Sequence, residues 1–256
     1  MQTSGRKLID PDAQARPVFI LSDRHDSVSV PWHSHRRTQL IHVSQGVLTV
    51  RTRDVRFVIP PQRAVWIGAG VAHCIEGRSP FWLTTCYIEP ELVAISAEPR
   101  VVTVDRLVDE LLIEASKFGG GYPEEGPQER LVTVLLDRLQ SLSVTDIALP
   151  EVKDHRLQRI CKRLIDTPSL DATLATLAAD SALTERTAAR LFLRETGMTF
   201  GKWRQHMRLQ RALEHLSTGS SVTQTAFEVG YSDVSSFIAA FKNLFGKTPA
   251  HILDRS

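Results

Sequence analysis

The sequence has few of the features that mark membrane, secreted or disulfide-stabilised proteins. Its three cysteines, Cys74, Cys86 and Cys161, are odd in number and lack the spacing of a zinc site. No apolar run approaches the roughly 20 residues that a membrane-spanning helix needs, and the polar residues 1–7 lack the apolar core of a signal peptide. These absences predict a cytoplasmic protein with reduced thiols and no membrane partner.

Motifs of common enzyme chemistries are also missing. The sequence contains no paired catalytic carboxylates, no nucleophile elbow and no phosphate-binding loop. The chain also lacks a large excess of positive or negative charge, because its 256 residues carry a net charge of only +2. Residues 1–150 contain 16 Lys and Arg against 18 Asp and Glu, whereas residues 151–256 contain 15 against 11. The C-terminal half is therefore the better candidate for contact with nucleic acid.

The chain is long enough for two domains, and 42% apolar residues can fill their cores. After a loose arm at residues 1–17, residues 18–100 contain short segments rich in β-branched and aromatic residues, such as 47–50, 56–59 and 82–88. We expect a small antiparallel β-barrel of the jelly-roll type there. Helical segments follow, so the predicted fold class is α+β.

Residues 101–142 have a helical period instead. Two stripes of apolar residues at intervals of three and four predict a pair of helices: Leu107, Leu111, Leu112 and Ala115, then Leu131, Leu135 and Leu139. This helical pair either covers the barrel or forms the face of a homodimer. Residues 143–153 are the predicted linker to an all-α domain at residues 154–256.

One helix-turn-helix pattern occurs twice in this last domain, at about 173–195 and about 221–245. A small residue, Ala178 or Ala226, lets the first helix of each unit pack closely on the second. Gly230 suits the positive φ that the turn favours, whereas Ala182 stands at the matching position of the first unit. The amphipathic pattern of residues 200–216 predicts a single rigid helix, which sets the separation of the two units.

The second helix of each unit can enter the major groove of DNA, so its first residues are the candidates for DNA contacts. In the first unit they are Thr184, which is also the predicted N-cap, Glu185, Arg186, Thr187 and Arg190. In the second unit they are Ser232, the predicted N-cap, Asp233, Ser235, Ser236 and Lys242. Arginine is the commonest reader of guanine, and the less charged second unit is expected to position the protein. Further phosphate contacts are predicted on the connecting helix: Lys202, Arg204, Arg208 and Arg211.

Two segments of this domain carry more specific motifs, RETGMTF at residues 194–200 and, within 222–249, Gly230-Tyr231, Phe241-Lys242 and the final FGKTP. They resemble the AraC/XylS family of bacterial transcription regulators. The resemblance implies a seven-helix domain that carries two helix-turn-helix units and binds double-stranded DNA at direct-repeat promoter sites. It also allows RNA polymerase as a partner. Ala182 and Ala188 depart from the family pattern, which usually has Gly and Leu there.

Three histidines and one glutamine form a second candidate site. His33 and His35 share one face of a strand, Gln39 has the same parity, and His73 follows a glycine-rich turn. Three imidazoles with an oxygen donor suit a divalent metal such as zinc, nickel or iron. The set resembles the metal site of cupin barrels, in which a carboxylate usually stands at the place of Gln39. Without a metal, these residues would line an effector cavity or support the barrel.

The two resemblances together imply a cupin-like sensor for a small-molecule effector, joined to a sequence-specific DNA reader. Trp32, Trp66 and Trp82 are candidates for the effector pocket or for the core, and Cys74 for a buried inert thiol. The alternative hypothesis is a metal-dependent cupin oxygenase or isomerase that uses the three histidines and Gln39, with the helical domain as an accessory.

Overall fold

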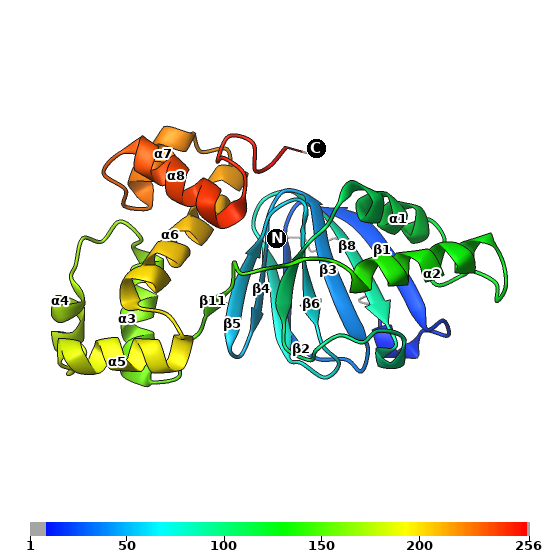
Figure 1. Ribbon diagram of the computed structural model, residues 1–256, viewed down its shortest axis with the longest axis horizontal. Coiled ribbons are helices and arrows are strands. Elements are labelled where there is room, and N and C mark those ends of the chain that lie inside the picture. Colours follow the sequence, from blue (N-terminus) through cyan, green and yellow to red (C-terminus); the bar gives the residue numbers. More distant parts are fainter. Residues whose placement is uncertain (1–8, 255–256) are drawn as a thin grey trace.

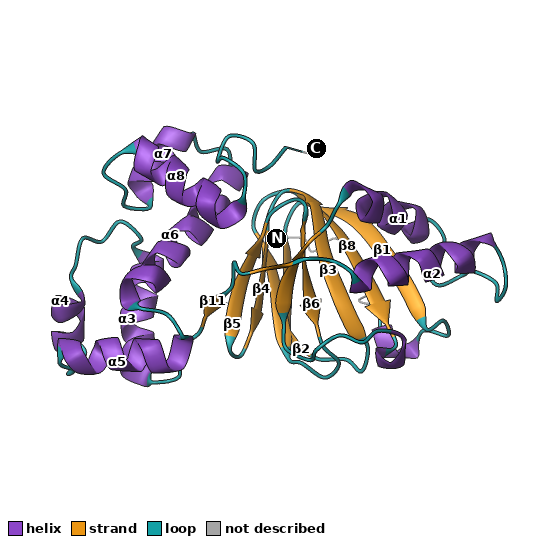
Figure 2. Cartoon of the chain, in the orientation of Figure 1, coloured by secondary structure: helices purple, strands orange, loops and turns teal. Residues whose placement is uncertain are grey.

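The computed structural model describes residues 9–254, which form a strand-rich half and a helical half (Figure 1). Figure 2 shows the strands gathered in one body with helices on one side of it, and a second body made of helices beside it. Among the described residues, no helix is long and apolar enough to cross a membrane. The predicted α+β class with two domains is confirmed.

The strand-rich half, here the β-domain, contains two antiparallel sheets. Its strands are β1 (Val18–His25), β2 (Val28–His33), β3 (Thr38–Gln45), β4 (Leu48–Thr52), β5 (Val55–Ile59), β6 (Arg63–Ile67), β7 (His73–Gly77), β8 (Phe81–Ile88), β9 (Arg100–Thr103), β10 (Val144–Thr145) and β11 (Leu149–Pro150), with 3-10 helices at Pro11–Ala13 and Pro90–Leu92. The strand orders are β1-β8-β3-β6-β9-β10 and β11-β5-β4-β7-β2. Within residues 9–254 no strand pair joins the two sheets, so the predicted barrel is not closed.

Apolar side chains from both sheets fill the space between them, which explains why an open pair of sheets is stable. Ile41 and Val65 of the six-stranded sheet and Val50 and Phe57 of the five-stranded sheet are all fully buried in one cluster. Successive side chains of a strand point to opposite faces. Leu40, the neighbour of Ile41, therefore lies in a second cluster on the outer face of the six-stranded sheet.

That outer face is covered by α1 (Arg106–Ser116) and α2 (Pro127–Gln140). Most of the predicted stripes are correct, but Leu107 is 53% exposed and Val108 is buried in its place. The predicted buried position is wrong by one residue. The leucine pattern of a short helix does not show which side of the apolar stripe contacts the sheet. Trp66 is also buried in this cluster, whereas Trp32 and Trp82 are 51% and 39% exposed. The three tryptophans therefore do not line one pocket.

Two segments that were predicted to be loose are held by the β-domain. Arg37, which is buried, donates hydrogen bonds to the backbone oxygens of Arg16 (2.6 Å) and Gln14 (2.8 Å). Residues 9–17 of the predicted arm are thus anchored, and residues 1–8 lie outside the described part of the chain. The predicted linker supplies β10 and β11, each of which adds an edge strand to one sheet and satisfies backbone groups there.

The helical half contains α3 (His155–Asp166), α4 (Leu174–Ala179), α5 (Glu185–Thr196), α6 (Phe200–Ser217), α7 (Val222–Glu228) and α8 (Val234–Phe245). The two helix-turn-helix units are α4–α5 and α7–α8, and α6 connects them as predicted (Figure 1). The AraC-type resemblance implied a seventh helix. After α8, the described residues form turns with hydrogen bonds from the N–H of His251 to Thr248 and of Asp254 to His251, a spacing of three residues rather than the four of an α-helix.

The turns of the two units differ by one residue. Ala182 and Gly230 occupy matching positions with φ of +56° and +88°. Thr184 caps α5 two residues after Ala182, but Asp233 caps α8 three residues after Gly230, and its Oδ1 accepts from the N–H of Ser236 at 2.8 Å. Ser232 was therefore wrongly predicted as the second N-cap, because the second turn is longer than the first.

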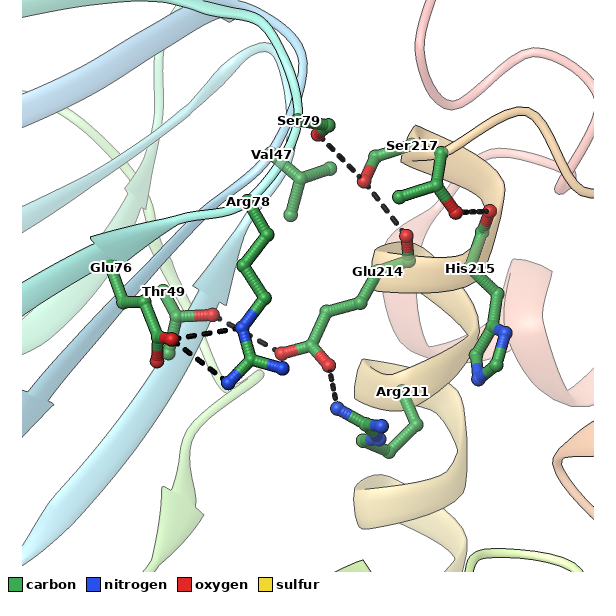
Figure 3. Close-up of a pocket in the computed structure, with 10 residues that line it drawn as sticks. Val47, Thr49, Glu76, Arg78, Ser79, Arg211, Glu214, His215 and Ser217 are labelled. Atoms are coloured by element: carbon green, nitrogen blue, oxygen red, sulfur yellow. Dashed lines mark hydrogen bonds and ion pairs between the residues drawn. The ribbon is translucent and has the colours of Figure 1, made fainter. Parts of the chain in front are cut away.

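The two halves of the molecule meet along α6. Glu214 projects from α6 toward the five-stranded sheet (Figure 3), where its Oε1 accepts from Arg56 Nη2 (2.5 Å) and from the Thr49 hydroxyl (3.2 Å), and its other oxygen pairs with Arg211. The Arg56 and Glu214 side chains are only 11% and 21% exposed. An ion pair with so little access to water restricts how the two halves can move apart.

Replacing Glu214 with Gln should weaken this interface. The variant leaves the buried guanidinium of Arg56 without its counter-charge, and we expect a loss of about 1–3 kcal/mol in the free energy of unfolding. Urea denaturation measures it. Glu76→Gln is the matched control, because Glu76 pairs with Arg78 in an exposed ion pair and should change stability by less than about 0.5 kcal/mol. Equal losses in both variants would contradict a special role for Glu214.

Replacing Ala182 with Gly should stabilise the protein by roughly 0.5–1 kcal/mol, because glycine adopts positive φ without the strain of a Cβ atom. The reverse change, Gly230→Ala, should destabilise it by about 1–3 kcal/mol. A Cβ atom there would lie 2.6 Å from Arg208 Nη2 and 2.9 Å from Ser169 Cα. Thermal and urea unfolding of both variants check the signs, and a destabilised Ala182→Gly protein would refute the strain.

Candidate DNA-reading helices and histidine cluster

One face of helix α5 is polar and exposed, whereas the opposite face packs against the rest of the domain. Thr184 accepts from the N–H of Thr187 at 3.2 Å and starts the helix, while Ala188 and Phe192 are buried. Arg186 and Arg190, four residues apart, lie together on the exposed face. Within residues 9–254 neither guanidinium has an ion-pair or hydrogen-bond partner. These two side chains are therefore available to an external partner.

Helix α8 is held by three aromatic residues and exposes small polar ones. Phe237, Phe241 and Phe245 are buried at intervals of four, with ring centroids 5.6 Å and 4.6 Å apart. The candidates Ser232, Ser235, Ser236 and Lys242 are all exposed. The carboxylate of Asp233 is engaged at the start of the helix, where the N–H of Ser236 lowers its pKa. The side chain of Ser236 also bonds to Asp233, so the candidate donors that remain are the hydroxyls of Ser232 and Ser235 and the ammonium group of Lys242.

Three arginines of α6 make contacts within the chain that the sequence did not predict. Arg204 Nη1 donates to the backbone oxygen of Ala172 (2.8 Å), and Arg208 Nε donates to that of Pro168 (3.0 Å). Arg211 pairs with Glu214. Each of the three has at least one donor engaged by the α3–α4 loop or at the domain interface, and Lys202 is the exposed member of the predicted set. Sequence reasoning could not find these contacts, because the partners of Arg204 and Arg208 lie 32 and 40 residues away.

The β-domain brings the three predicted histidines together. His33 ends β2 and pairs in register with His73 at the start of β7, and His35 follows two residues after His33. One ring nitrogen from each lies within 4.8 Å of the others. His35 and His73 are buried, while His33 is half-buried. Cys74, the neighbour of His73, is not part of the cluster among the described residues and is only half-buried.

Each histidine of the cluster is oriented by a backbone carbonyl. The Nδ1 atoms of His33, His35 and His73 lie 2.9 Å, 2.7 Å and 3.0 Å from the oxygens of Pro31, Arg37 and Val71. A carbonyl oxygen can only accept, so each Nδ1 carries a hydrogen, and the Nε2 of a neutral ring holds a lone pair. Burial lowers the pKa of His73 to about 4, which keeps that ring neutral at pH 7. Metal-binding histidines are commonly oriented in this way.

Gln39 completes the cluster. Its Nε2 donates to the Thr85 hydroxyl (2.8 Å), which turns its Oε1 to within 3.1 Å of His35 Nε2. In a neutral His35 these are two acceptors that face one another, an arrangement that a shared cation would stabilise. His73 Nε2 is buried and has no hydrogen-bond partner among the described residues. The donor set therefore fits a divalent transition-metal ion, which prefers imidazole and tolerates an amide oxygen.

Comparisons with known proteins cover both halves of the chain. Residues 17–117 match the family described as AraC-like ligand binding domain, and residues 177–255 match a helix-turn-helix domain family. The HTH-type transcriptional regulator NimR of Escherichia coli strain K12 is 30% identical over 248 residues, 96% of this chain and 91% of NimR. The HTH-type transcriptional activator RhaR of Mannheimia succiniciproducens is 31% identical over 91% of this chain and 90% of RhaR. The structure of Vibrio cholerae ToxT aligns over 94% of this chain and 99% of its own, with 11% identity and a TM-score of 0.40.

These matches decide between the two hypotheses that the sequence left open. The relatives that match both halves are transcriptional regulators and not enzymes. The helix-turn-helix domain implies DNA binding, and the ligand-binding domain implies a small-molecule effector. The chain belongs to the AraC family of transcriptional regulators.

Proposed function

We propose that residues 154–256 bind a specific promoter site through α5 and α8, and that the β-domain controls this binding in response to an effector. The observation that carries the proposal is the pair of guanidiniums on the exposed face of α5, which have no partner within the described part of the chain, on a helix whose other face is packed. In this proposal Arg186 and Arg190 read base edges, since the guanidinium fork matches guanine. Thr184, Glu185 and Thr187 form the start of the same reading helix.

The second unit is proposed to position the protein on the duplex. Ser232, Ser235, Ser236 and Lys242 offer exposed donors that suit phosphate oxygens. Asp233 contributes by capping α8, which directs those donors. Hydroxyl and ammonium contacts to phosphate carry little base preference, so the second unit should add affinity more than selectivity.

We also propose homodimers, with RNA polymerase as a partner at the promoter. The exposed Leu107 (53%) and Val134 (49%) of the α1–α2 pair support a dimer face, since exposed apolar side chains of a helical pair favour association. A cytoplasmic location follows from a DNA target and is supported by three free cysteines.

The histidine cluster is the proposed sensor site. His33, His35 and His73 would hold a divalent metal ion through their Nε2 atoms, with Gln39 Oε1 as a fourth donor. The three oriented Nδ1–H groups and the unpartnered Nε2 of His73 support this assignment. The ion would supply a Lewis-acid position at which an effector is recognised.

Arg186→Ala should weaken binding to the specific site by about 1–3 kcal/mol and relax base choice at one position. Fluorescence anisotropy with operator and with random duplex at fixed salt measures both effects. Arg194→Ala is the matched control, because it removes the same charge from the last turn of the same helix. If Arg186→Ala weakened binding to both duplexes equally, the base-reading role of Arg186 would be wrong.

The untagged, metal-free protein should bind one Zn²⁺ per chain in a calorimetric titration. His33→Ala should weaken that binding at least about tenfold, the size of effect that changes around a metal site produce. His251→Ala, which removes an exposed histidine outside the cluster, should leave the affinity unchanged. Wild-type affinity in His33→Ala would exclude the metal site.

A further inference from the structure

We propose that Gln39 makes the histidine site electrically neutral, and that the effector is therefore a small organic anion, a carboxylate, that binds the metal ion and supplies the missing negative charge. This inference rests on the metal site of the proposed function. It adds the chemical class of the effector, which neither the fold nor the family states.

The argument starts from the charge of the donors. Three imidazoles and one amide contribute no negative charge, and no Asp, Glu or Cys joins the cluster within residues 9–254. A divalent ion held by this set would keep its full charge of +2. His35 and His73 are 6% and 0% exposed, so part of that charge would lie away from water. A buried charge without a counter-charge is costly, and an anion that enters with the ion removes this cost.

Glu89, an acidic residue that follows β8, is already committed to an ion pair. Arg37, whose backbone oxygen orients His35, pairs with Glu89 through a contact of 2.9 Å. The side chain of Arg37 is 3% exposed, so moving Glu89 away would leave a buried guanidinium without its partner. Glu89 is therefore not free to neutralise the ion, and no other carboxylate of residues 9–254 belongs to the cluster.

The cluster is also accessible. His33 is half-buried, and its neighbour Trp32 is 51% exposed. A small molecule can thus approach from the His33 side, while His35, His73 and Gln39 hold the ion from the buried side.

Binding of the ion and binding of the anion should then be coupled, because each supplies the charge that the other lacks. By linkage, the anion tightens metal binding by the same factor as the metal tightens anion binding. Neutral molecules of the same shape gain nothing from the charge of the ion. A metal-dependent preference for carboxylates over their amides is the signature of this mechanism.

The first experiment uses the untagged, full-length, metal-free chain. Zn²⁺ is titrated calorimetrically at fixed pH and ionic strength, alone and with acetate, benzoate, acetamide or benzamide. We expect acetate and benzoate to tighten Zn²⁺ binding about tenfold, the scale on which neighbouring groups tune metal sites, and the amides to have no effect. Co²⁺ replaces Zn²⁺ in a parallel series, in which the carboxylates should change the visible absorption spectrum because they enter the coordination shell.

The second experiment supplies the charge from the protein itself. Gln39→Glu should tighten Zn²⁺ binding in the absence of any carboxylate and abolish the additional effect of acetate. Gln45→Glu makes the same change at an exposed position of the same strand and should behave like the wild-type protein. Circular dichroism verifies that both variants are folded, and the wild-type series does not depend on either variant.

The outcomes separate the two levels of the proposal. If the wild-type chain binds no Zn²⁺, or if His33→Ala binds it equally well, both the metal site and the anionic effector are overturned. If Zn²⁺ binds but carboxylates and amides act alike, or if the Co²⁺ spectrum does not respond to carboxylates, the metal site stands and the anionic effector is overturned.

Discussion

The relative position of all parts of this protein depends on one helix, α6, which is bound along its length on the side of the β-domain. Trp203 donates to the backbone oxygen of Pro150 (2.9 Å), Gln210 donates to that of Ile147 (2.8 Å), and Glu214 pairs with Arg56. These three contacts lie along successive turns of α6. A rigid helix bound in this way sets both the separation of the two helix-turn-helix units and their position on the β-domain.

The two units do not depend on the β-domain equally. The apolar cluster between the sheets continues into the second unit, through Leu213 and Phe237. Arg63 of β6 also donates to the oxygen of Phe245 at the end of α8 (3.0 Å). The first unit has a cluster of its own, to which the β11 segment adds only Leu149 and Val152. The second unit therefore packs more extensively against the β-domain than the first unit does.

Local patterns predicted most elements because the residues that decide them are neighbours in sequence. Strand alternation, helical stripes, the Thr184 cap and the positive φ at Ala182 and Gly230 all belong to this class. The errors have two causes. Either the true partner of a side chain lies far away in the sequence, or a predicted position is displaced by one residue. Ser232 was preferred to Asp233 as a cap because the two turns were assumed to be equally long. Arg208 was read as a free cation because the oxygen of Pro168 is not close in sequence.

By itself, the sequence determined the fold class, the two helix-turn-helix units with the exposed residues of their second helices, and the three histidines that gather beside Gln39. Each of these follows from a period or a spacing that hydrogen bonding and side-chain alternation impose on nearby residues. Only the tertiary structure decided that the sheets stay open, that the linker adds strands to them, and that Glu214 joins the two halves. It also showed that three carbonyls orient the three histidines. These features depend on contacts between residues as many as 165 positions apart, and no local pattern records such a distance.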